Sequence, residues 1–176
     1  MELVRCRICG EVYFGKHPTH CPFCGAHGVY LISIGSWKDE NIGITLTDTD
    51  KTNLETTRDL EYENTRFYRA ASATASTDEL KGYFKYLAKI ENEHYNVAIK
   101  LLGGEKDNSI FEPSEEKGSD LANLEHSKQK EDHASKLYAT FIPESGSERL
   151  KVFFTALSEV EADHIELDDK EIENIK

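Results

Sequence analysis

The segment LAKIENEHY, residues 87–95, places a glutamate and a histidine three positions apart, as Glu91 and His94. The apolar spacing around them predicts a helix, on which residues three apart share one face. Phe84 and Leu87 lie on the same face, so both polar side chains are expected to point into the core, where they need partners. Taken alone, the pair is better explained as an exposed ion pair, because this chain is rich in acidic residues.

A second copy of the pattern changes that interpretation. The segment ALSEVEADHIEL, residues 156–167, contains Glu161 and His164, each 70 positions after its counterpart. An ungapped offset of this kind is an internal repeat, and it divides the chain into two similar halves. The same offset aligns Glu61 with Glu131, Tyr68 with Tyr138, Thr77 with Ser147, Leu80 with Leu150, Lys81 with Lys151, Phe84 with Phe154 and Leu87 with Leu157.

Hydrophobic periodicity and capping residues predict four helices. We expect them at about 53–75, from after Thr77 to near Leu102, from about 119 to the FIPES segment, and from Ser147 almost to the C-terminus. Short connections make each consecutive pair an antiparallel hairpin. The segment 103–119 is long enough to cross the whole bundle, which is the ferritin-like arrangement. The predicted fold is therefore mainly α, a ferritin-like four-helix bundle over residues 53–176.

Residues 1–34 differ from the rest, because they hold all four cysteines and short strand-like apolar segments. Cys6, Cys9, Cys21 and Cys24 form two Cys-x-x-Cys pairs, a spacing typical of a tetrahedral four-thiolate metal site. A unit this small needs the metal for its stability. Zinc and iron both fit the spacing. Residues 35–52 are polar and are expected to be a linker between this small β module and the bundle.

The repeat also predicts a metal site in the bundle. Each hairpin supplies one glutamate and one Glu-x-x-His pair, which is the pattern of di-metal carboxylate proteins. Four carboxylates need cations to be stable in an apolar core, and ligation rich in oxygen suits iron or manganese. The predicted ligands are Glu61, Glu91, His94, Glu131, Glu161 and His164.

Two tyrosines follow the first glutamate of each hairpin by seven residues. Tyr68 and Tyr138 either fill the core or donate a hydrogen bond to a metal-bound carboxylate across the bundle. Residues two positions from a predicted ligand are expected to face solvent. These are Glu63, Glu93, Glu159, Asp163 and His133.

Composition excludes several other functions. The net charge of −12 argues against nucleic acid and anionic membranes as partners. The sequence shows neither a transmembrane run nor a secretory signal, so we expect a cytoplasmic protein with a metal bound by its cysteines rather than disulfides.

With these motifs in place, the chain resembles the rubrerythrin family. LEYENTRFYRAAS (60–72), LAKIENEHY (87–95), QKEDHASKLYATF (129–141) and ALSEVEADHIEL (156–167) are similar to its bundle helices, and CRICGEVYFGKHPTHCPFCGA (6–26) to its rubredoxin-like module. The resemblance implies a non-haem di-iron peroxidase that reduces hydrogen peroxide to water. It implies two Fe at the six bundle residues and one Fe, or Zn, at the four cysteines.

The resemblance also implies partners. Electrons would come from rubredoxin or an NAD(P)H-dependent reductase, and the protein would be a homodimer. Because the linker is long and polar, we expect the module to dock on a neighbouring chain.

The chain departs from the common family pattern in two respects. The module precedes the bundle, as in reverse rubrerythrins. The positions one turn from Glu131 hold Ser127, Lys128, Ala134 and Ser135, where typical members carry an extra glutamate. Two alternatives therefore stay open: a ferroxidase that oxidises Fe(II) with oxygen, and a zinc-ribbon interaction or iron-storage protein without redox turnover.

Overall fold

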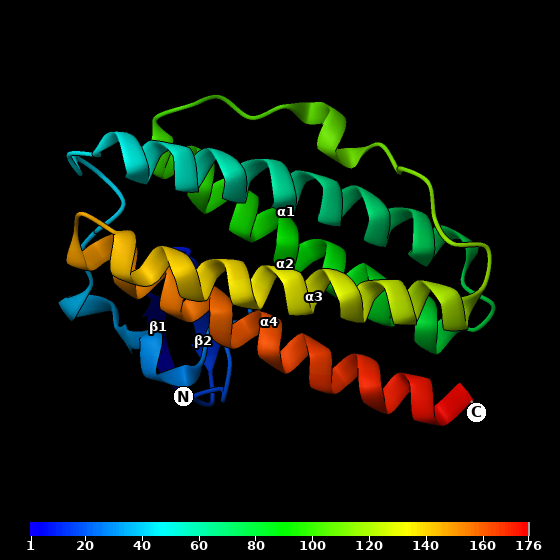
Figure 1. Ribbon diagram of the computed structural model, residues 1–176. Helices are drawn as coiled ribbons and strands as arrows, with labels where there is room; N and C mark the ends of the chain where they lie inside the picture. The colour runs from blue at the N-terminus through cyan, green and yellow to red at the C-terminus, as the bar shows by residue number, and fades with distance from the viewer. Residues whose placement is uncertain (176) are drawn as a thin grey trace.

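A computed structural model describes residues 1–175. The protein is mainly helical, with a small three-stranded antiparallel sheet at its N-terminus followed by a helical bundle (Figure 1). The long helices are α1 (Asp48–Thr74), α2 (Asp78–Leu102), α3 (Asp120–Glu144) and α4 (Glu148–Ile175). This confirms the predicted fold class. No helix within residues 1–175 combines the length and the apolar character needed to cross a bilayer.

Capping residues set the helix ends. The hydroxyl oxygen of Thr77 accepts a hydrogen bond from the Leu80 amide, and Gly103 ends α2 in a left-handed conformation with φ 68°. One boundary prediction is wrong: α1 begins five residues early, at Asp48, so residues 48–52 are helical and do not belong to the linker. The cause is a capping box, in which Thr47 and Asp50 bond each other's backbone amides.

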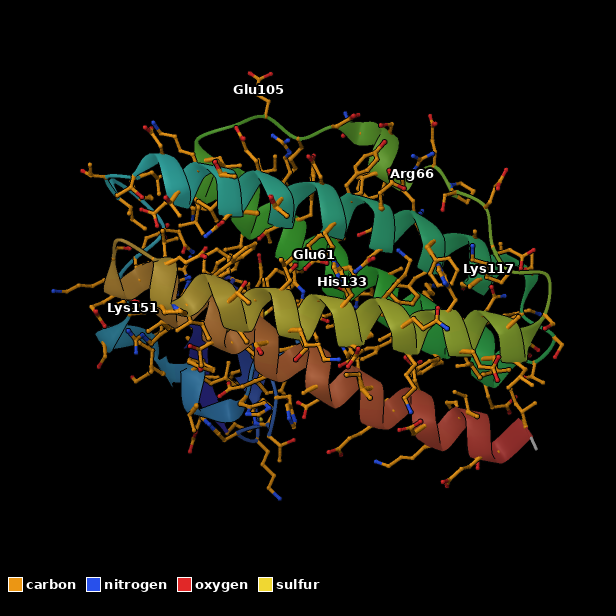
Figure 2. The ribbon with its side chains drawn as sticks, in the orientation of Figure 1. Glu61, Arg66, Glu105, Lys117, His133 and Lys151 are labelled. Atoms are coloured by element: carbon orange, nitrogen blue, oxygen red, sulfur yellow. The ribbon has the colours of Figure 1, made fainter. Side chains whose placement is uncertain are left out.

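The two hairpins, α1 with α2 and α3 with α4, are joined by the predicted crossover. Residues 103–119 run along the outer side of α1 from one end of the bundle to the other (Figure 1). The side chains of Arg66 and Arg69 donate hydrogen bonds to the backbone carbonyls of Glu112 and Phe111, which fix this segment on α1. Arg66 lies on the side of α1 that faces the crossover (Figure 2).

The N-terminal sheet has the order β2-β1-β3, from β1 (Glu2–Cys6), β2 (Val12–Gly15) and β3 (Leu31–Ser33). Single-turn 3₁₀ helices lie directly before β3, at Gly28–Tyr30, and directly after it, at Ile34–Ser36. We call residues 1–34 the cysteine module. It packs against α2 and α4 so closely that a side chain at Gly25 would meet Val160 at 2.9 Å, and φ of 73° there also favours glycine.

The segment between the module and α1 is held in place rather than loose. Trp37 donates from Nε1 to the Cys6 carbonyl at 3.2 Å, and Asn41 donates from Nδ2 to the Ile8 carbonyl at 3.1 Å. Arg149 at the start of α4 donates to the side-chain oxygen of Asn41 at 2.6 Å. The module therefore contacts its own bundle in this structure, and docking on a neighbouring chain stays a prediction.

Candidate metal centres

Four helices bring the six predicted bundle ligands together. Glu61 comes from α1, Glu131 from α3, and one Glu-x-x-His pair from each of α2 and α4. In Figure 2, Glu61 lies at the middle of the bundle between α1 and α3. All six side chains are at most 2% exposed, so the expectation that they point inward is correct.

The first ligand group surrounds His94. Its Nδ1 atom lies 3.2 Å from Glu91 Oε2, 3.3 Å from Glu161 Oε1 and 3.6 Å from Glu61 Oε1. The four residues offer three carboxylate oxygens and one imidazole nitrogen, all within 4.8 Å of one another. The group could hold one metal ion.

The second group surrounds His164 in the same way. Its Nδ1 atom lies 3.2 Å from Glu161 Oε2, 3.3 Å from Glu91 Oε1 and 3.7 Å from Glu131 Oε2. It is again three carboxylate oxygens with one imidazole nitrogen. The sequence repeat thus becomes a structural repeat, with one group for each half of the bundle.

Glu91 and Glu161 belong to both groups. Each presents one carboxylate oxygen to His94 and the other to His164. A carboxylate placed in this way can bridge two metal ions. Glu61 and Glu131 each belong to one group only, so they would be terminal ligands if the cluster held two metal ions.

The pKa shifts of the glutamates and histidines in this cluster are those expected of a site for cations. Burial raises the pKa of Glu61 and Glu131 well above the usual carboxyl range, and neighbouring carboxylates raise it further. Burial lowers the pKa of His94 and His164, but the three glutamate carboxylates that surround each Nδ1 outweigh this and raise it well above normal. Without cations the cluster therefore neutralises itself by holding protons.

Buried polar atoms without hydrogen-bond partners also favour bound cations in this cluster. In the described part of the chain, both carboxylate oxygens of Glu161 and both ring nitrogens of His164 are buried without a hydrogen-bond partner. Orphaned polar atoms are rare in protein cores because each one costs free energy. Two cations would satisfy both Glu161 oxygens and Nδ1 of His164, so the residues present fit a di-metal centre.

The two tyrosines form a reciprocal pair across the bundle. Tyr68 on α1 donates its hydroxyl hydrogen to Glu131 on α3, and Tyr138 on α3 donates to Glu61 on α1. Both phenols are fully buried. They therefore orient the terminal carboxylates as well as fill the core.

One buried residue near the site was not predicted. Asp168, one turn after His164 on α4, accepts a hydrogen bond from the Tyr83 hydroxyl at 2.7 Å. Burial raises the pKa of Asp168 to about 6, although the nearby Ser127 hydroxyl and the hydrogen bond from Tyr83 lower it. Ser127 in turn lies 2.9 Å from the Tyr68 hydroxyl. Asp168 on α4 thus places a carboxylate near Ser127 on α3. Ser127 is one of the positions one turn from Glu131 at which the sequence itself has no carboxylate.

The four cysteines gather inside the module. Cys6 and Cys24 have their sulfurs 3.7 Å apart, and those of Cys9 and Cys21 are 3.8 Å apart. Four thiolates around one tetrahedral ion with 2.3 Å bonds lie about 3.8 Å apart, so the geometry fits a single metal. No disulfide forms among these cysteines.

The module contacts the bundle beside the di-metal residues. His94 donates from Nε2 to the backbone carbonyl of Cys24 at 2.9 Å, which leaves its Nδ1 free for a metal. Glu159 accepts a hydrogen bond from Tyr30, and Asp163 lies 2.8 Å from His27 Nε2. Both acids keep 38% of their side chains exposed, so they face solvent only in part, because the module contacts this face of α4.

The other residues that were expected to face solvent differ in how exposed they are. Glu63 and His133 are exposed, as predicted. Glu93 is half-buried, and burial raises the pKa of its carboxyl group.

A cavity of about 280 Å³ reaches the site from the surface. His164 lines it, together with His20 and Gly25 of the module and Tyr86 of α2. The larger surface cavity of about 660 Å³ touches none of the six ligands. Only a small molecule fits the cavity beside His164.

Comparison with known proteins adds no assignment: no family model, curated protein or solved structure matches the chain.

Proposed function

We propose that this protein is a non-haem di-iron peroxidase that reduces hydrogen peroxide to water. The observation that carries the proposal is the direct contact between two candidate metal centres, through His94 and the Cys24 carbonyl. A di-metal site alone suits many functions. A four-thiolate site in contact with it supplies a route for electrons, which reductive turnover requires.

The residues present suit iron in both centres. Six carboxylate and imidazole side chains match the ligand preference of iron or manganese, and four thiolates match iron or zinc. Bound iron would supply the redox chemistry, with electrons entering at the cysteines from rubredoxin or an NAD(P)H-dependent reductase and reducing peroxide in the bundle.

The chain itself must bind the oxidant and exclude larger molecules. The cavity beside His164 is small and leads to the second ligand group. Hydrogen peroxide fits such a cavity, and the burial of all six ligands keeps bulk water away from them. This geometry supports a small oxidant as the substrate.

Reduction of one hydrogen peroxide to two waters consumes two electrons and two protons. Tyr83 donates to Asp168, the Ser127 hydroxyl lies near Asp168 and 2.9 Å from the Tyr68 hydroxyl, and Tyr68 donates to Glu131. These side chains lead from the half-buried Tyr83 toward Glu131. Because the pKa of Asp168 is about 6, its carboxyl group exchanges protons near neutral pH. We assign Asp168 the role of delivering protons to the site.

Peroxide consumption by the reduced protein with an excess of electron donor tests the proposal. Glu161→Ala should abolish turnover, and the matched variant Glu63→Ala, on the exposed side of α1, should leave it unchanged. Asp168→Asn should keep its metals but turn over more slowly. Full activity in Glu161→Ala would contradict the proposal.

A further inference from the structure

A third cluster of metal-binding side chains lies outside both centres. His20 and His27 of the cysteine module meet Asp163 of α4, and their ligand atoms lie within 4.8 Å of one another. The side chains are 46%, 36% and 38% exposed, so ions in solution can reach them. Two imidazoles and one carboxylate are a common ligand set for divalent transition metals.

The two histidines aim the same atom at the carboxylate. Nε2 of His20 lies 3.3 Å from Asp163 Oδ2, and Nε2 of His27 lies 2.8 Å from it. Two ligands on a tetrahedral ion with bonds of 2.0–2.1 Å lie about 3.3 Å apart. The first distance already matches, and the second requires a shift of about 0.5 Å.

The opposite nitrogen of each ring lies near a side-chain oxygen. His20 Nδ1 lies 3.0 Å from the Thr19 hydroxyl, and His27 Nδ1 lies 3.8 Å from Glu159 Oε2. Glu159 is held in turn by the Tyr30 hydroxyl. The Thr19 hydroxyl can orient the His20 ring and keep its Nε2 free for an ion, whereas 3.8 Å is too long for a hydrogen bond between His27 and Glu159.

The backbone fixes the two histidines relative to each other. His20 and His27 form an isolated antiparallel bridge, and their rings meet edge to face with centroids 5.0 Å apart. The pair therefore enters the cluster from one rigid turn, and Asp163 is the only ligand from the bundle. A metal ion here would join the module to α4.

We propose that His20, His27 and Asp163 form a third metal site, which binds one divalent ion of the zinc type and fastens the cysteine module to α4. The three protein ligands leave the remaining positions to water. This proposal does not depend on the peroxidase function, because it uses none of the bundle ligands and none of the cysteines.

Titration of the iron-loaded protein with Zn²⁺ in a calorimeter tests the site. We expect the unaltered protein to bind one Zn²⁺ per chain without loss of iron. His20→Gln and His27→Gln should each weaken this binding by more than about tenfold. The control is His17→Gln, an exposed histidine of the same module, which should bind Zn²⁺ as the unaltered protein does.

Two further measurements separate loss of this site from misfolding of a variant and from Zn²⁺ binding at another place. With Cu²⁺ as probe, electron paramagnetic resonance should show coupling to two imidazole nitrogens, and to one in each variant. Hydrogen exchange over residues 19–31 should slow when Zn²⁺ is added, but not in His20→Gln. Absence of Zn²⁺ binding, or equal binding by His20→Gln, would overturn the proposal and leave a plain hydrogen-bonded contact.

Discussion

The Nε2 atom of His94 lies 2.9 Å from the carbonyl oxygen of Cys24, so a bundle ligand and a thiolate ligand are one hydrogen bond apart. Both residues belong to the same chain. The proposed electron transfer from the cysteine module to the bundle would therefore have a short path within one chain.

The intrachain contact predicts the outcome of mixing two inactive variants. Cys9→Ser lacks a working thiolate site, and Glu161→Ala lacks a working di-metal site. Because the module docks on its own bundle, mixed dimers should not regain peroxidase activity. Subunit exchange must be verified by labelling each variant. Recovery of activity in verified mixed dimers would show transfer between chains instead.

Replacing a carboxylate that belongs to both ligand groups should remove more metal than replacing one that belongs to a single group. Glu91→Ala removes a residue common to both ligand groups, so both metals should be lost from the bundle. Glu61→Ala removes a ligand of one group only, so one metal should remain. Metal analysis of anaerobically purified protein measures this, with Glu63→Ala as control. If Glu91→Ala keeps both metals, the bridging assignment is wrong.

Removing a phenol hydroxyl should loosen the terminal carboxylate that it bonds. Tyr138→Phe frees Glu61, and Tyr68→Phe frees Glu131. We expect metal loss to a chelator to speed up by about 10- to 100-fold in each variant. Tyr68→Phe should in addition slow peroxide turnover more, because only Tyr68 also contacts Ser127. Equal chelator kinetics in the variants and the unaltered protein would contradict this role.

Metal binding by the metal-free protein should release protons. The pKa values of Glu61, Glu131, His94 and His164 are raised in the metal-free site, so these groups hold protons that cations must displace. Affinity should therefore rise with pH. Calorimetry in buffers of different ionisation enthalpy measures the released protons. Binding that is independent of pH would contradict the predicted protonation.

The helix bundle and its six inward-facing acids and histidines followed from the sequence because the repeat encodes them twice. A lone Glu-x-x-His is ambiguous, but the same pair at an offset of 70 with Glu61 and Glu131 specifies one face on each helix. The crossover followed from the length of residues 103–119 and the rise of the helices.

The docking of the module could not be predicted in the same way. It depends on long-range contacts such as Arg149 with Asn41, and single polar residues in a linker carry no periodic signal. Asp168 was missed for a related reason, since the offset aligns it with Ala98 and the repeat does not mark it. The signal available in the sequence was an acidic residue one helical turn after His164, on the same face of the helix.

The central claim is that the iron-loaded protein reacts preferentially with hydrogen peroxide. The most direct measurement is stopped-flow oxidation of the fully reduced protein by hydrogen peroxide and, separately, by oxygen at equal concentration. Peroxide should oxidise the bundle iron faster than oxygen does. Clearly faster oxidation by oxygen would contradict it and favour the ferroxidase alternative.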